Sequence, residues 1–205
     1  MYSPSYNRIE NGTELLAFMR ANSFPILVTG TGGVLYASHL PITAHAQGRQ
    51  IVIDMHMAKN NLQWQEFLDD EVMVIFAGPH AYISPRWYED RERVPTWNYA
   101  AVHAYGVPRI INEKKQKHES QRRLIESIDP DWLPKFDALR QDYTDRMLDG
   151  IVNFAIPVKR IEMRWKLSQN RGRREMELIA AQLDRSADSR ERALAALTRK
   201  HYVEN

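Results

Sequence analysis

A succession of short apolar segments, joined by tight turns with no helical segment between them, constrains the fold of this chain more than any other feature. Residues 25–29 and 34–39 flank the glycine-rich turn 30–33, and residues 41–46 and 50–56 flank the turn Gln47-Gly48-Arg49. Each pair has the pattern of a β-hairpin. Because parallel neighbours need a long and usually helical crossover, two successive hairpins predict an antiparallel sheet.

Later strands and helices complete a mainly β fold, which we expect to be an antiparallel barrel with added helices. Pro157 is expected to mark an edge or a bulge of the last strand, and Gly78-Pro79 to end the strand that begins at Val72. The further strands are predicted at residues 72–76, 81–84, 96–106 and 151–165. Helices are predicted at residues 13–20, 61–69, 113–128, 143–148, 173–183 and 189–199.

The composition excludes several kinds of chemistry. There is no cysteine, so disulfides, thiolate zinc sites and cysteine nucleophiles are ruled out. The histidines lack the helical spacing of a metal site and the serines lack the G-x-S-x-G elbow, so we assign no metal and no catalytic residue. The first residues do not resemble a signal peptide, and no apolar run approaches the ~20 residues of a membrane span. We therefore expect a cytoplasmic protein that does not bind a membrane.

The charge distribution gives little support for DNA binding. Residues 171–205 contain eight Lys/Arg and six Asp/Glu, which accounts for the whole net charge of +2. A nucleic-acid-binding protein concentrates basic residues on one face or in one segment. The densest basic cluster, residues 171–174, is followed at once by Glu175 and Glu177, which favours a solvated helix start. No helix-turn-helix with a basic recognition helix is visible.

The predicted strand at residues 96–106 is unusually polar. It starts after Pro95 and ends at Gly106, yet it contains Thr96, Asn98 and His103. A buried polar group without a partner costs about 1–3 kcal/mol. We therefore expect something polar to meet this strand; the alternative is a half-exposed strand whose polar residues face water.

Residues 55–64 indicate an anion site where a strand passes into a helix. Unpaired backbone N–H groups at a helix start attract anions, and Lys59 adds a positive charge beside them. Either Asn60 or Asn61 can cap this helix. The alternative is a bare helix cap next to a surface lysine.

Two other strand ends carry an excess of polar residues. Ser38-His39-Leu40-Pro41 places two hydrogen-bonding side chains before a proline, which cannot donate to a sheet and so frees its neighbours for a ligand. The last predicted strand ends in Trp165-Lys166-Leu167-Ser168-Gln169-Asn170. Both ends are candidates for contact with a polar ligand.

Together, and in this order, these motifs closely resemble the PaiB-like family of FMN-binding negative transcriptional regulators. The resemblance spans roughly residues 1–171. It implies a flavin-binding split β-barrel, related to pyridoxamine-phosphate oxidases, that is normally a homodimer with FMN between the subunits and represses bacterial stress or sporulation-type genes. The motifs that carry it are Met1-Tyr2-Ser3-Pro4, Ser38 to Pro41, His56 to Trp64, Gly78 to Tyr88, Val94 to His103 and Trp165 to Asn170.

The resemblance also implies a domain division and a set of FMN-binding residues. Residues 1–171 would form the flavin-binding domain, with a helical insertion at about 113–148, and residues 172–205 a helical extension. Residues 165–170 of one subunit are expected to close over FMN held by the other. The phosphate is assigned to Lys59, Asn60 and Asn61, the polar edge of the isoalloxazine to Ser38, His39 and Leu40, ring stacking to Trp64 or Trp97, and the rest of the pocket to Thr96, Asn98, Tyr99, Lys166, Ser168 and Gln169.

Two other functions stay open at this point. One is a flavin-dependent oxidoreductase of the same fold, which reduction of the bound flavin by NADH or NADPH would favour. The other is a haem-binding or haem-degrading split barrel, which a haem absorption band would identify. A regulator could act through DNA or through a regulatory protein partner, and the sequence does not choose between them.

Overall fold

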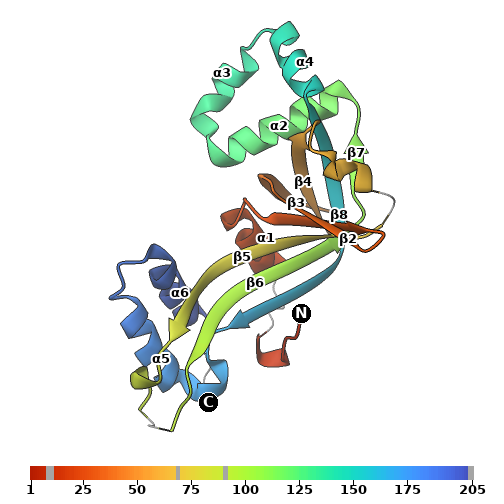
Figure 1. Ribbon diagram of the computed structural model, residues 1–205. Helices are drawn as coiled ribbons and strands as arrows, with labels where there is room; N and C mark the ends of the chain where they lie inside the picture. Colours follow the sequence, from red (N-terminus) through yellow and green to blue (C-terminus); the bar gives the residue numbers. More distant parts are fainter. Residues whose placement is uncertain (8–11, 68–69, 90–91, 203–205) are drawn as a thin grey trace. The chain divides into compact units, whose positions relative to one another are not determined.

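The computed structural model describes residues 1–7, 12–67, 70–89 and 92–202, and eight strands of one sheet lie within them (Figure 1). The strands are β1 (Ile26–Thr31), β2 (Val34–His39), β3 (Ile42–Gln47), β4 (Gln50–Ala58), β5 (Val72–Ile83), β6 (Thr96–Gly106), β7 (Arg109–Ile111) and β8 (Ile151–Lys166). The α-helices are α1 (Gly12–Ala21), α2 (Lys114–Ile128), α3 (Leu133–Asp137), α4 (Gln141–Asp149), α5 (Gly172–Leu183) and α6 (Ser189–Lys200). Short 3-10 helices are η1 (Ser5–Asn7), η2 (Leu62–Glu66), η3 (Pro85–Trp87), η4 (Pro130–Trp132) and η5 (Gln169–Arg171).

The sheet has the order β2-β1-β5-β6-β8-β4-β3, with β7 beside β8. The two predicted hairpins form as β1–β2 and β3–β4, and β1–β5, β4–β8 and β7–β8 also pair antiparallel. The predicted antiparallel fold with added helices is therefore confirmed. The sheet does not close into a complete barrel.

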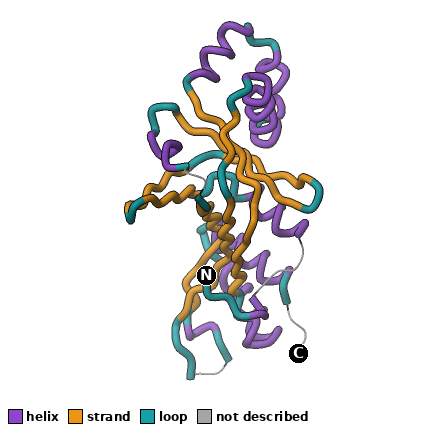
Figure 2. Tube along the Cα trace, turned by 90° about the vertical axis from the view of Figure 1, so that its right-hand side faces the viewer, coloured by secondary structure: helices purple, strands orange, loops and turns teal. Residues whose placement is uncertain are grey.

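The chain divides into two compact units, which we describe separately. Unit 2 comprises Thr13–Phe76 and His103–Ile161. Its core contains fully buried aliphatic and aromatic side chains of both hairpins and β8, among them Leu27, Ile42, Ile53, Met55 and Phe154. Helices α2, α3 and α4 lie together in two views (Figures 1 and 2).

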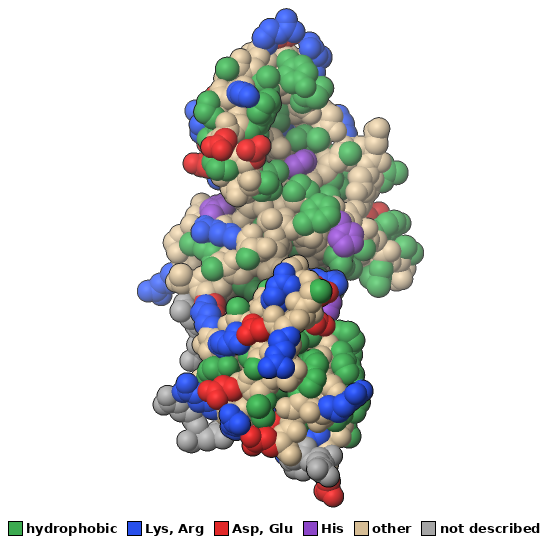
Figure 3. Space-filling view, turned by 90° about the vertical axis from the view of Figure 1, so that its left-hand side faces the viewer, with side chains coloured by type: hydrophobic (Ala, Val, Ile, Leu, Met, Phe, Trp, Pro, Cys, Tyr) green, Lys and Arg blue, Asp and Glu red, His purple; other side chains and the backbone are tan. Residues whose placement is uncertain are grey.

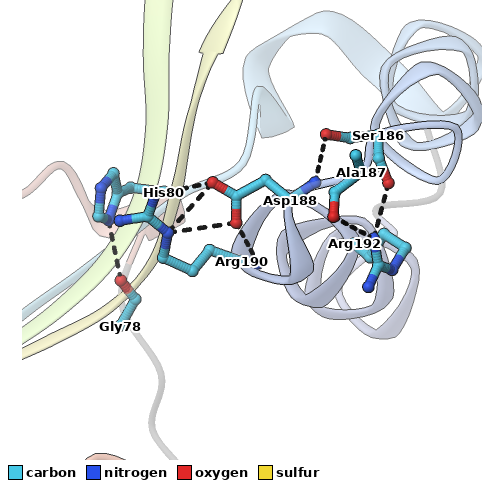
Figure 4. A network of polar contacts seen from close by, with 7 residues as sticks. All are labelled: Gly78, His80, Ser186, Ala187, Asp188, Arg190 and Arg192. Atoms are coloured by element: carbon cyan, nitrogen blue, oxygen red, sulfur yellow. Dashed lines mark hydrogen bonds and ion pairs between the residues drawn. The ribbon is translucent and has the colours of Figure 1, made fainter.

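Unit 1 comprises Met1–Gly12, Ala77–Val102 and Glu162–Asn205. Helices α5 and α6 pack against each other through buried apolar residues that include Met176, Ile179 and Leu194. Asp188 caps α6 by accepting from the Arg190 backbone, and the Arg190 guanidinium binds the same carboxylate (Figure 4). These hydrogen bonds lower the pKa of Asp188 to about 2.

A partly buried ion pair attaches α2 to the sheet of unit 2. The Arg123 Nε and Nη2 atoms donate to Oδ2 of Asp54 at 3.0 and 2.7 Å, and the Asp54 side chain is only 5% exposed. Its neighbour Arg122 instead binds Asp137 on the helix surface with two bonds of 2.7 Å. Two adjacent arginines therefore make one partly buried and one exposed salt bridge.

Three predicted elements differ from the structure. The strand from Val72 does not end at Gly78-Pro79 but continues to Ile83. Because β1 pairs only with Met73–Ile75, the missing N–H of Pro79 leaves no hydrogen bond to β1 unmade. The helix predicted at 61–69 is only the 3-10 helix η2 over residues 62–66, and residues 68–69 lie outside the described part of the chain.

Pro157 does not mark an edge, because β8 lies inside the sheet between β6 and β4. The β7–β8 register pairs Arg109 with Ala155, which places the break between β6 and β7 opposite Pro157. Gly106 ends β6 at this break, and a Cβ atom there would lie 2.4 Å from the Pro157 carbonyl oxygen. Pro157 thus lies opposite the residues between β6 and β7, which belong to neither strand.

Candidate flavin site

The predicted FMN-binding residues form two clusters, one in each unit. The Lys59 cluster, in unit 2, contains Ser38, His39, Leu40, Lys59, Asn60, Asn61 and Trp64. The Trp97 cluster, in unit 1, contains Thr96, Trp97, Asn98, Tyr99, Lys166, Ser168 and Gln169.

The Lys59 cluster is built on the connection between β4 and η2. Asn61 Nδ2 donates to Ser38 Oγ at 2.9 Å, and Asn61 Oδ1 caps η2 by accepting from the Gln63 backbone at 3.1 Å. The Lys59 N–H donates to the Gly150 carbonyl, and Trp64 Nε1 donates to the Lys59 carbonyl at 3.0 Å. The backbone of Lys59 is therefore fixed from both sides, while its side chain and that of Asn60 are exposed.

Gln63 orients this cluster and is a residue that the sequence did not single out. Its buried Nε2 lies within 3.2–3.3 Å of the Leu27 carbonyl, Thr29 Oγ1 and the Tyr36 carbonyl. These contacts hold η2 against the β1–β2 hairpin. Because they join residues about thirty positions apart, local sequence pattern gives no signal for them.

The two residues next to Ser38 are differently placed. The exposed His39 ring stacks on Phe24 with centroids 5.8 Å apart. Leu40 is buried, and its N–H donates to the Pro25 carbonyl at 3.2 Å. The amide of Leu40 is thus already used within the protein.

A cavity of about 230 Å³ adjoins Lys59. Its wall includes Lys59, Trp64, Asn112, Lys117 and Asp149. Two lysines line this cavity. Lys117 Nζ donates to the carbonyls of Leu148 and Ile151 at 3.3 and 3.1 Å. The ammonium group of Lys59, in contrast, makes no hydrogen bond within the described residues. An ammonium and an indole at one cavity suit a phosphate and its apolar neighbour. The sequence placed Lys117 on a charged helix and gave no sign that it approaches Lys59.

In the Trp97 cluster the polar residues of β6 meet the end of β8. The buried side chains of Asn98 and Ser168 exchange two hydrogen bonds of 3.0 and 3.2 Å. Lys166 Nζ donates to the Trp97 carbonyl at 2.7 Å and to Thr96 Oγ1. The partners of Thr96 and Asn98 thus include residues of their own chain. Desolvation and, to a smaller extent, the cation of Arg164 lower the pKa of Lys166.

Gln169 and Tyr99 also have partners within the protein. Gln169 Nε2 donates to the Trp165 carbonyl, and its Oε1 accepts from the Leu167 backbone, so the amide closes the turn at residues 165–169. The Arg164 guanidinium lies 5.6 Å from the centre of the Tyr99 ring. These side chains therefore support the shape of the cluster.

Trp97 itself is exposed and belongs to an aromatic surface. Its side chain is 54% exposed, and the rings of His80 and Tyr82 lie 6.2 and 6.3 Å from it between centroids. Offset and edge arrangements of this kind are favourable for aromatic groups. The sequence showed an aromatic segment at residues 78–88, but pairing of β5 with β6 was needed to place His80 and Tyr82 beside Trp97.

Comparisons with known proteins agree with this architecture. A family described as "Putative FMN-binding domain" matches residues 1–160. The chain is 37% identical over 200 residues to "Protease synthase and sporulation protein PAI 2" of Bacillus subtilis, a match that covers 96% of each protein. It is 25% identical over 232 residues to an uncharacterized protein of Emericella nidulans, covering 91% of each.

Two solved structures share the fold at low identity. The flavocytochrome Anf3 from Azotobacter vinelandii aligns with a TM-score of 0.60 and 10% identity, over 77% of this chain and 68% of that one. The FAD and heme binding protein from Mycobacterium smegmatis aligns with a TM-score of 0.61 and 12% identity, over 77% and 72%. At these identities the likeness shows the fold alone.

The fold is thus a split barrel of the type found in flavin-binding proteins. The chain belongs to the FMN-binding domain family named above, within which it is a PaiB-like member, as the sequence resemblance predicted. This family match confirms FMN as the predicted cofactor. Among the described residues, no helix is long and apolar enough to cross a membrane.

Proposed function

We propose that this protein is a homodimeric FMN-binding regulator in which the Lys59 cluster holds the FMN phosphate. The observation that carries the proposal is the exposed Lys59 side chain, on a backbone fixed by Gly150 and Trp64, at the wall of a cavity. A charge-assisted hydrogen bond from a lysine ammonium to phosphate is strong and specific for the phosphorylated flavin. When bound, FMN supplies the capacity for one- and two-electron transfer.

The Trp97 cluster is proposed to supply an aromatic surface for the isoalloxazine. Trp97 offers exposed ring area, and Lys166 holds the neighbouring backbone through its bonds to Trp97 and Thr96. We propose that FMN lies at the subunit interface. A homodimer is supported by β2, which ends the strand order and exposes Val34, Leu35 and Tyr36 by 53, 77 and 43%. An exposed apolar edge strand is a site of association.

The test is to purify the full chain without added cofactor, record its absorption spectrum and measure its mass in solution. We expect flavin bands, release of FMN on denaturation, and a dimer. A haem band in place of the flavin bands would contradict the cofactor assignment. A stable monomer with one FMN per chain would contradict the interface.

We further propose that the regulatory role does not depend on direct DNA binding by this protein alone. Much of the basic charge of residues 171–205 is paired: Arg173 with Glu177, Arg174 with Glu89, Arg190 with Asp188 and Arg199 with Asp184. Arg192 donates to the carbonyls of Ser186 and Ala187 (Figure 4). On the face shown in Figure 3, basic and acidic side chains are interspersed.

We therefore expect the purified protein to bind duplex DNA only weakly, with a dissociation constant of about 10⁻⁶ to 10⁻⁴ M at physiological salt that weakens steeply as salt is added. Fluorescence anisotropy with promoter and scrambled duplexes at several salt concentrations measures this. Sequence-specific protection of a promoter by the isolated protein at physiological salt would show that regulation is direct.

A further inference from the structure

A second cavity of unit 2 lies away from the predicted flavin residues. It has a volume of about 480 Å³, within the range of small-molecule sites, and is formed by α1, β3 and α2 together with Ser23. None of its lining residues belongs to the Lys59 cluster or the Trp97 cluster. The lining residues are Arg20, Ser23, Ile42, Thr43, Ala44, His45, Arg123, Glu126 and Ser127.

The cavity wall carries one cation and one anion that make no ion pair within the described residues. Arg20 donates from Nε to the Ala44 carbonyl at 2.8 Å, which fixes the guanidinium and leaves its two terminal nitrogens available. Glu126 faces no competing bridge, because its helical neighbour Arg122 holds Asp137 in a bidentate pair. Arg123 is occupied by Asp54 through Nε and Nη2.

Two buried polar atoms of the wall also lack a hydrogen-bond partner in the part of the chain that the structure describes. They are Thr43 Oγ1 and His45 Nδ1. His45 Nδ1 lies 3.7 Å from Asp54 Oδ2, which is too long for a hydrogen bond. Both atoms have almost no exposed surface, so we assign neither of them to a ligand in the cavity. Ile42 and Ala44 also line the cavity and are almost fully buried.

From this arrangement we propose that the cavity is a second binding site, for a small zwitterion that carries a carboxylate and an ammonium group, as an amino acid does. The Arg20 guanidinium binds the carboxylate, since its planar fork matches two carboxylate oxygens. The Glu126 carboxylate binds the ammonium group.

A ligand with only one of the two charges would form only one of the two ion pairs, with Arg20 or with Glu126. The site therefore discriminates against simple carboxylic acids and simple amines. Binding there joins α1, β3 and α2, so it gives a flavoprotein of regulatory type a way to respond to a metabolite.

The test is calorimetric titration of the FMN-loaded full chain with each of the twenty common amino acids. For the tightest binder, the corresponding deaminated acid and decarboxylated amine are titrated as well. We expect one or a few amino acids to bind, and the acid and the amine to bind at least tenfold more weakly. Heat from none of the twenty amino acids would overturn the proposal.

Variants assign the two charges. Arg20→Gln is expected to abolish binding of the amino acid, and Arg20→Lys to weaken it less. Glu126→Gln is expected to weaken binding of the amino acid until its affinity is close to that of the deaminated acid. Arg122→Gln and Glu119→Gln change the same residue types on α2 outside the cavity wall and are expected to bind like the native chain. The near-UV circular dichroism and the FMN content of each variant show whether it has folded.

Two results would count against a separate site. Native affinity in Arg20→Gln would show that the ligand binds elsewhere, and displacement of FMN by the amino acid would show that it occupies the flavin site. Failure of this proposal leaves the flavin assignment intact, because FMN content is measured independently and depends on other residues.

Discussion

Replacing Lys59 with alanine is expected to weaken FMN binding by about 10- to 100-fold while leaving riboflavin binding nearly unchanged, because a hydrogen bond to a charged group contributes roughly 1.5–3 kcal/mol. FMN and riboflavin differ only in the phosphate, so the ratio of their dissociation constants isolates the anion site. In the native chain FMN should bind much more tightly than riboflavin. In Lys59→Ala this difference should narrow, as measured by quenching of flavin fluorescence on titration with apoprotein.

The control for Lys59→Ala is Lys115→Ala. Lys115 is an exposed lysine of α2 in the same unit, and it does not line the cavity beside Lys59. It should retain the native preference for FMN. Equal affinity of the native chain for FMN and riboflavin would remove Lys59, Asn60 and Asn61 from the phosphate site.

Arg123→Ala is expected to lower the free energy of unfolding by about 2 kcal/mol, less than the roughly 3–5 kcal/mol reported for fully buried pairs, because Arg123 is 41% exposed. The loss arises mainly because the buried Asp54 side chain loses two hydrogen bonds and its paired guanidinium. Urea unfolding followed by far-UV circular dichroism measures the difference, and an unchanged m-value shows that the unfolding transition itself is comparable.

Arg122→Ala is the matched control, one position earlier on the same helix. Its two bonds to Asp137 lie at the surface, where water screens the charges and replaces the lost contacts. It should therefore destabilise the protein far less than Arg123→Ala. A similar loss in both variants would mean that helix content, rather than the buried charge, determines the effect. The double variant Arg123→Ala with Asp54→Ala should recover part of the stability, since no buried charge remains.

The strands could be predicted well because their signals are local. Glycines at the turns and apolar residues on either side specify the β1–β2 and β3–β4 hairpins, and Gly106 ends β6 where expected. The errors occur where contacts between residues far apart in the sequence determine the structure. Leu62 and Phe67 suggest a longer helix. In the structure this segment forms only the short 3-10 helix η2, from which Gln63 makes hydrogen bonds to the β1–β2 hairpin.

The candidate site shows the same division between local and distant information. The Asn61 cap was foreseeable because side-chain capping acts over two residues. The Asn98–Ser168 pair spans 70 positions and depends on how β6 and β8 meet. Sequence motifs could therefore identify both residues as candidates, whereas the hydrogen bonds between them could be found only from the fold. The assignment of individual residues to FMN stays a prediction.

Ser168, which is hydrogen-bonded to Asn98, has an unusual backbone conformation. Its φ is +67°, the left-handed region, where it is the sole non-glycine residue with positive φ among those described. That conformation costs a residue with a Cβ roughly 1–2 kcal/mol relative to the right-handed one. Glycine would remove the strain but also the hydroxyl that pairs with Asn98. Positions 98 and 168 are therefore expected to vary together over evolution, with glycine at 168 in relatives that have an apolar residue at 98.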